Sequence, residues 1–199
     1  MPSKYHHGEL RTVLVSTSLD LIAEQGLKGF SVAEVARRAA VSPAAPYRHF
    51  PDRESLLAAV ACRVALQLAE HVEASTAAQD DPAGKLAAAA GAYTAYVMDR
   101  RAGLHVVFAA GLDNPKYVEL HEHSRKLMDH FLVLAFAVAP DPQTALELME
   151  QLLAQAHGYA TFQLDGVFAQ HGYSTELVVR KSVESARIVI RGHLAPSGP

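Results

Sequence analysis

Hydrogen-bond donors suited to phosphates and base edges gather in a short stretch near the N-terminus of the sequence. Tyr47 and His49 can each donate one hydrogen bond to a phosphate oxygen, a contact that fixes position without reading sequence. Arg48 lies between them, and its guanidinium matches the two acceptors on a guanine edge. Ser31 and Arg53 are expected at helix starts, where free backbone N–H groups and the helix dipole favour a phosphate. Together these residues are typical of a surface that binds DNA.

Two short predicted helices position these side chains. The first is predicted from Ser31 to Ala39, with Glu34 three residues after Ser31 as a capping box. The second is predicted from Pro43 to His49, with Ser42 as its cap and proline at its first position. A turn of about three residues between such helices is the spacing of a helix-turn-helix. By spacing alone, a plain helical hairpin is the alternative.

The stretch from Ser31 to Val60 reads SVAEVARRAAVSPAAPYRHFPDRESLLAAV, and its Tyr-Arg-His-Phe segment ends at Phe50. It resembles the signature of the TetR family of transcriptional regulators, and the resemblance covers about the first 65 residues. The resemblance implies a dimeric repressor that binds a near-palindromic DNA operator and is released by a small-molecule effector. It also implies four contacts to the DNA backbone, from Ser31, Tyr47, His49 and Arg53.

Base reading is expected from the exposed face of the second helix. Arg48 suits guanine, whereas Ala44 and Ala45 offer only methyl groups, which suit thymine. Arg37 and Arg38 are expected either at a groove or phosphate, or as ordinary surface arginines. The N-terminal arm, with Lys4, His6 and His7, is expected either in a minor groove or as a free end. The predicted DNA contacts are Ser31, Arg37, Arg38, Ser42, Ala44, Ala45, Tyr47, Arg48, His49, Arg53 and Lys4.

Two residues depart from the pattern of the family. Ala40 stands in the turn where glycine is usual, and a positive φ there would cost about 1 kcal/mol. Pro46 replaces an aliphatic residue at the fourth position of the second helix, where we expect it to remove at most the first intrahelical hydrogen bond.

The charge distribution agrees with DNA binding only in the N-terminal part. The net charge of −3 argues against a nucleic-acid partner, because DNA-binding surfaces are usually basic. From Met1 to Ser55, however, seven Lys or Arg face six Asp or Glu, which gives +1, whereas the remainder has eleven against fifteen, which gives −4. A DNA-binding surface is therefore expected in the N-terminal part.

Apolar periodicity predicts an all-α fold. The predicted fold is an N-terminal three-helix domain with a helix-turn-helix and a larger C-terminal helical domain for effector binding and dimerisation. The domains are expected at residues 1–52, extending to about 65, and at 53–199. A first helix is predicted from the apolar face of Leu10 to Ile22, with Gly26 as its stop. Asp52 is predicted to cap a long helix at residues 53–78, and further helices are predicted at residues 83–100, 103–110, 115–137, 143–164 and 175–192.

The C-terminal half carries the candidates for an effector site. We expect no cofactor and no metal, because His121, Glu122 and His123 form no pair with ligand spacing and suit a solvated face better. Aromatic and polar residues of the middle helices are the candidate pocket, although ordinary core positions are the alternative for each. The candidates are Tyr93, Tyr96, Val97, His105, Phe108, Phe131, His157 and Phe162.

Apolar stripes on the last two predicted helices exceed the needs of one small domain, and by similarity to the family they form the homodimer interface. Ala156-His157-Gly158 resembles the Trp-His-Gly-type C-terminal domain of one TetR branch, with alanine in place of tryptophan. No nucleotide-binding or nucleophile motif is present, so an enzyme is not expected. We expect a cytoplasmic protein without a membrane partner. The alternative function is a helical ligand-binding or scaffold protein that binds no operator.

Overall fold

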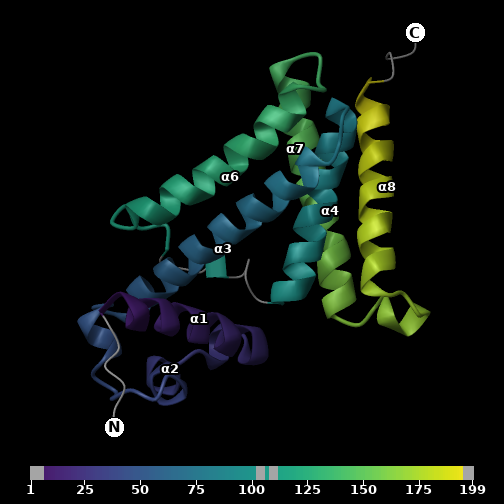
Figure 1. Cartoon of the computed structure of the whole chain (residues 1–199). Helices are drawn as coiled ribbons and strands as arrows, with labels where there is room; N and C mark the ends of the chain where they lie inside the picture. Colours follow the sequence, from purple (N-terminus) through teal and green to yellow (C-terminus); the bar gives the residue numbers. More distant parts are fainter. Residues whose placement is uncertain (1–6, 102–105, 108–111, 195–199) are drawn as a thin grey trace. The chain divides into compact units, whose positions relative to one another are not determined.

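The computed structural model describes residues 7–101, 106–107 and 112–194, and these ranges hold helices and no strand (Figure 1). The all-α prediction is confirmed. The predicted helix at residues 103–110 lies mostly outside the described residues. The elements in order are α1 (His7–Gln25), η1 (Leu27–Gly29), α2 (Val32–Arg38), η2 (Pro46–Arg48), α3 (Arg53–Ala77), α4 (Pro82–Arg100), α6 (Val118–Phe136), α7 (Pro142–Leu164), η3 (Ala169–His171) and α8 (Thr175–Leu194).

Contacts divide the chain into two compact units. The first unit comprises Met1–Ala65 and Ala102–Ser124, and the second comprises Leu66–Arg101 and Arg125–Pro199. A segment from the middle of the chain therefore clusters with the N-terminal helices.

The core of the first unit forms where α1, α2 and the start of α3 turn their apolar faces to one another. Leu14 and Leu21 of α1, Val35 of α2 and Leu56 of α3 are completely buried. Burial of each such side chain stabilises the fold by about 1.5–3 kcal/mol. The middle segment adds Val106, Leu112 and Leu120 to the same cluster.

The second unit is built on three helices, α4, α7 and α8, which pack side by side (Figure 1). Gly91 allows α4 to approach α8 closely, because a Cβ at this position would collide with Cγ2 of Val183. Buried hydroxyls join the three helices: the Thr94 Oγ1 lies 2.8 Å from the Ser182 Oγ and donates to the Ala156 carbonyl at 3.2 Å. The packing is therefore close, and the buried hydroxyls of Thr94 and Ser182 are paired.

Aspartates begin three of the helices. The Asp52 carboxylate accepts the Ser55 N–H at 2.6 Å, as the sequence predicts for the start of α3. Asp81 caps α4 and Asp141 caps α7 in the same way. Each cap satisfies a backbone donor that the helix itself leaves free, which is worth about 1 kcal/mol.

One helix among the described residues, α3, is long and apolar enough to cross a membrane by length and composition alone. Half of the relevant window is buried inside the protein, as in the core helix of a soluble protein.

Candidate nucleic-acid interface

The predicted turn of the helix-turn-helix is present, and it closes α2 with a Schellman motif. The Val41 N–H donates to the Ala36 carbonyl at 3.0 Å, and the Ala40 N–H donates to the Arg37 carbonyl at 3.2 Å. This geometry requires a left-handed residue after the helix, and Ala40 has φ 55°. Ala40 therefore takes the positive φ that glycine would adopt without strain.

The continuous helix predicted from Pro43 to His49 is wrong. Only Pro46–Arg48 is helical, as the 3₁₀ element η2, and a separate turn precedes it in which the Ala45 N–H donates to the Ser42 carbonyl. Pro46 has no N–H to donate to the Ser42 carbonyl, which would be the first bond of the predicted helix, and two short turns take the place of that helix. The effect of Pro46 is therefore larger than the loss of one bond.

This segment nevertheless presents donors to solvent. Tyr47 is 54% exposed and Arg48 is exposed, and the Arg48 side chain makes no ion pair with any acid in the described ranges. Pro46 and Phe50 are buried on the other side and anchor the segment to the core. Ser42 and Ala44 are exposed and Ala45 is half-buried, so most of the predicted base-reading face is open.

His49 is half-buried, and together with Arg11, Phe50, Ser55 and Lys116 it lines a cavity of about 470 Å³ in the first unit. Its imidazole is therefore less accessible than the side chains of the two residues before it.

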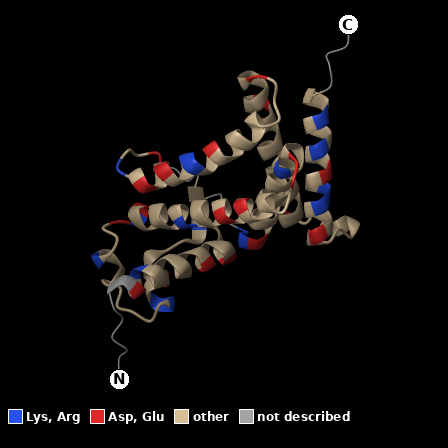
Figure 2. Cartoon of the chain, turned by 45° about the horizontal axis from the view of Figure 1, so that its top comes forward, with Lys and Arg blue, Asp and Glu red and all other residues tan. Residues whose placement is uncertain are grey.

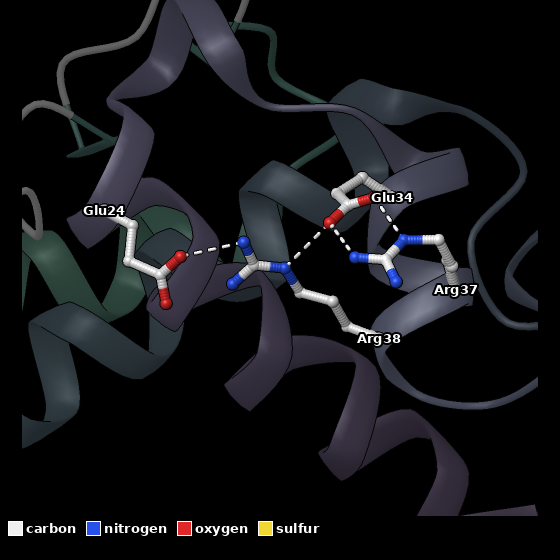
Figure 3. A network of polar contacts seen from close by, with 4 residues as sticks. All are labelled: Glu24, Glu34, Arg37 and Arg38. Atoms are coloured by element: carbon white, nitrogen blue, oxygen red, sulfur yellow. Dashed lines mark hydrogen bonds and ion pairs between the residues drawn. The ribbon is translucent and has the colours of Figure 1, made fainter.

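Arg37 and Arg38 are held inside the protein's own network of ion pairs (Figure 3). The Glu34 carboxylate accepts two hydrogen bonds from Arg37, at 2.7 and 2.8 Å, and one from Arg38 Nε at 2.9 Å. Arg38 also pairs with Glu24 of α1 at 2.8 Å, which joins the end of α1 to α2. Arg37 has a 72% exposed side chain and remains within reach of solvent, whereas Arg38 is 24% exposed.

The same network replaces the predicted capping box. Ser31 has the extended backbone of an N-cap, but its side chain makes no cap hydrogen bond. The Glu34 carboxylate is occupied by the two arginines, whose hydrogen bonds lower its pKa to about 2. Because the arginines are stronger partners than a backbone N–H, the capping box is wrong, and Ser31 stays exposed at the start of α2.

Arg53 begins α3 as predicted, and its guanidinium packs against its own unit. Nη2 donates to the Leu27 carbonyl at 3.3 Å, and the guanidinium carbon lies 5.3 Å from the Phe30 ring centroid. Among the predicted DNA contacts, Lys4 lies outside the described residues, as does His6 of the same arm, and the side chain of His7 is not described.

Sequence reasoning missed Glu24 and Glu34 as partners of the arginines. The spacing of Glu34 to Arg37 and Arg38, three and four residues, contained the signal for those pairs. No local signal pointed to Glu24, because it lies on another helix.

The candidate effector residues separate into two places. Tyr93, Phe131 and His157 lie together in the second unit: Tyr93 Oη is 3.2 Å from His157 Nδ1, and the Tyr93 ring meets Phe131 edge to face at 6.5 Å. Burial raises the pKa of the Tyr93 hydroxyl to about 12, so it keeps its proton at neutral pH. Val97 is also buried, and the buried Tyr96 donates its hydroxyl to Gln67 at 3.2 Å.

Phe162 does not share that environment, because it lies at the end of α7 with a 52% exposed side chain and packs on Phe168. His105 and Phe108 lie outside the described residues.

The fold and this surface define a class of protein: an all-helical DNA-binding regulator in which a small helix-turn-helix unit accompanies a larger helical unit. Two family models match the chain. The model of bacterial regulatory proteins of the tetR family matches residues 14–60, and that of the tetracyclin repressor-like C-terminal domain matches residues 86–186. The chain therefore belongs to the TetR family of transcriptional regulators, and it is not an enzyme.

Solved structures agree with this assignment at the level of the fold. A protein of unknown function from Rhodococcus sp. RHA1 has 28% identity and a TM-score of 0.77, with 96% of this chain and 98% of that chain covered. A TetR-family transcriptional regulator from Streptomyces coelicolor has 18% identity, a TM-score of 0.70 and coverage of 94% and 96%. A TetR variant from Acinetobacter baumannii, in complex with minocycline, has 18% identity, a TM-score of 0.66 and coverage of 98% and 100%. No curated relative matches the chain.

Proposed function

We propose that this regulator is a cytoplasmic repressor that binds a near-palindromic operator as a homodimer. The observation that carries the proposal is the exposed pair Tyr47 and Arg48, held on a short segment anchored by buried Pro46 and Phe50 directly after α2 and its turn. Tyr47 contacts a phosphate and fixes register, whereas Arg48 reads a guanine. In a homodimer, two such segments about 34 Å apart meet successive major grooves on one face of the duplex.

The other predicted contacts have secondary roles. Ser31 is exposed at the start of α2 and adds a phosphate contact, together with the backbone N–H groups of that helix. Arg37 reaches a phosphate only if its ion pair with Glu34 breaks. Arg38 has a structural role, because its ion pair with Glu24 joins α1 to α2. Arg53 combines packing on Phe30 with a contribution to the phosphate potential at the start of α3.

Effector binding, which releases the repressor from its operator, is assigned to the second unit. We propose that a small-molecule effector binds near Tyr93, Phe131 and His157, where a buried hydroxyl and an imidazole offer hydrogen bonds between apolar walls. The minocycline complex of the Acinetobacter relative supports an effector in this part of the family, with no implication that the compound is the same. An effector that binds more tightly to the dimer arrangement that does not fit the operator lowers the affinity for the operator. The reduction is limited by the ratio of the effector's affinities for the two arrangements.

The test is selection of bound sequences from a library of random duplexes, followed by affinity measurements on the recovered site. A near-palindrome is expected. An absence of enrichment with the folded protein would favour a helical scaffold that binds no operator.

Arg48→Ala then tests the assignment of base reading. The substitution is expected to weaken binding to the selected site by about 1–3 kcal/mol and to change binding to random duplexes much less. Arg63→Ala, which removes an exposed arginine of α3 outside the helix-turn-helix, is the control and should leave the preference intact. Equal losses on both DNAs would refute the role of Arg48.

A further inference from the structure

The cavity of about 470 Å³ in the first unit has the dimensions of a small-molecule site and a partly apolar lining. Phe50 and Leu120 are buried in its wall, and Ala59 and Cys62 of α3 are half-buried there. Burial raises the pKa of the Cys62 thiol to about 11, so the thiol is uncharged at neutral pH and belongs to this apolar wall. The cavity therefore suits the apolar body of a small organic molecule.

Two cations line the cavity, and the chain neutralises them to different extents. Arg11 of α1 makes no ion pair with an acid of the described residues. Lys116 has a long ion pair with Asp52, at 3.5 Å. Glu119 is the single acid among the described lining residues. Basic and acidic residues are interspersed over the first unit (Figure 2), so individual cations, and Arg11 above all, decide which charge the cavity favours.

A hydrogen-bond donor of the same cavity has no acceptor. Tyr117 lines the cavity, and its Oη is buried without a hydrogen-bond partner in the described part of the chain. The Lys116 ammonium lies beside the same ring, 4.8 Å from its centre. Val118 and Glu119, which also line the cavity, begin α6, and the first N–H groups of a helix have no partner within it. A negatively charged acceptor would therefore pair with groups that the chain leaves unsatisfied.

We propose that this cavity binds a small organic carboxylate with an apolar body. The body lies against Phe50 and Leu120, and the carboxylate accepts hydrogen bonds from Arg11 and from the Tyr117 hydroxyl. A guanidinium and a carboxylate match in two parallel hydrogen bonds, which makes this pair stronger than one between neutral groups. The lining residues all belong to the first unit, so the site is separate from the effector site proposed at Tyr93.

The cavity adjoins the segment to which the proposed function assigns DNA contacts. His49 and Phe50 line it, and they directly follow Tyr47 and Arg48. A bound carboxylate places negative charge beside residues that approach phosphates, so occupancy is expected to lower operator affinity. This consequence rests on the proposed operator binding, whereas binding of the carboxylate to the chain does not.

Calorimetric titration of the full chain without DNA tests the binding. The probes are benzoate, naphthoate and octanoate, which share a carboxylate and differ in the apolar body, each compared with its uncharged amide. We expect saturable binding of at least one carboxylate, at one site per chain and about tenfold or more tighter than its amide. No saturable binding of any of the three carboxylates, or equal affinity for acid and amide, would overturn the proposal.

Substitutions then locate the bound carboxylate. Arg11→Met removes the charge and keeps an apolar contact with Phe50, whereas Tyr117→Phe removes only the hydroxyl. Each is expected to weaken the best carboxylate about tenfold. Arg63→Met, at an exposed arginine of α3 outside the cavity, is the control and should leave the affinity unchanged. Unchanged affinity in both cavity variants would overturn the site, and a loss in Tyr93→Phe alone would place the carboxylate in the second unit.

A filling variant keeps the test independent of the cations. Ala59→Leu adds bulk to the wall of the cavity and leaves Arg11 in place, so it should abolish binding of the carboxylate. Unaltered binding to this variant would overturn the cavity as the site. On the selected operator, a saturating amount of the carboxylate should lower the DNA affinity of the unmodified chain and not that of Arg11→Met. An equal effect on both chains would refute regulation through this cavity.

Discussion

Ala40 shows how a single residue type sets a local cost. Its φ of 55° belongs to the left-handed region, where a Cβ meets the following carbonyl oxygen at a cost of about 1 kcal/mol. Glycine takes this conformation freely, and the Schellman hydrogen bonds that close α2 do not involve the side chain.

Ala40→Gly is therefore expected to increase the free energy of unfolding by about 1 kcal/mol, diminished by the greater freedom of glycine in the unfolded chain. Chemical denaturation with Ala39→Gly as the control should separate the two effects, because Ala39 has φ −74° and gains nothing from glycine. Destabilisation at both positions would contradict the strain at Ala40.

Glu34 predicts a pH dependence that belongs to one carboxyl group. Hydrogen bonds from Arg37 and then Arg38 lower its pKa from 4.5 to about 2. A carboxyl whose pKa is depressed on folding stabilises the protein above its unfolded pKa, and that stabilisation is lost as the pH falls through the folded pKa. The relevant window therefore lies between about pH 4.5 and pH 2.

Glu34→Gln should lower the thermal midpoint relative to the unmodified chain at neutral pH. The difference between the two midpoints should shrink as the pH falls from 4.5 towards 2, because protonation removes the charge from the unmodified glutamate as well. Glu54→Gln, at a glutamate for which the nearest arginine nitrogen lies 3.8 Å away, is the comparison. A difference that stays constant with pH would show that the network contributes packing rather than charge.

At the scale of elements, the contact between α4 and α8 depends on one glycine. Gly91 faces Val183, a β-branched residue whose side chain has few alternative rotamers. An added methyl group must therefore displace the backbone of one helix.

Gly91→Ala is expected to destabilise the second unit by about 1–3 kcal/mol despite the better helix propensity of alanine. The double variant Gly91→Ala with Val183→Ala should recover part of that loss, because it frees the space that the methyl needs. Denaturant unfolding measures the free energy of unfolding of the single and the double variant. If Val183→Ala gave no rescue, close packing at this crossing would not be the reason for the glycine.

At the scale of the whole molecule, charge is divided unevenly along the chain. The N-terminal part to Ser55 carries +1 and the remainder −4, so long-range attraction to DNA is weak and contact with phosphates must be local. Tyr47 and Arg48 of the segment after α2 are exposed and available for that contact.

The logarithm of the DNA affinity is expected to fall linearly with the logarithm of salt concentration, with a slope of about −0.9 for each phosphate neutralised. With Arg48 and few other free cations in the described helix-turn-helix, we expect a shallow slope of about −2 to −5 for the dimer. Titrations of the selected operator at several salt concentrations give this slope, and a slope near −10 would show that many more cations, such as those of the N-terminal arm, reach the backbone.

The sequence alone determined the all-helical class, the position of the helix-turn-helix and the aspartate cap of α3. These features depend on local periodicity, on capping chemistry and on residues that are neighbours in the chain. It also marked Ala40 as a position where a positive φ would be costly, because alanine stands where the family usually has glycine, and the structure gives this residue a φ of 55°.

Only the tertiary structure decided which side chains remain available. Arg38 pairs with Glu24 from another helix, Phe162 lies apart from Tyr93 and His157, and short turns replace the predicted second helix around Pro46. Residues 102–124 cluster with the N-terminal helices, although they are distant in sequence. Pairing and burial depend on which surfaces meet in space, and a one-dimensional pattern specifies only the face of each element.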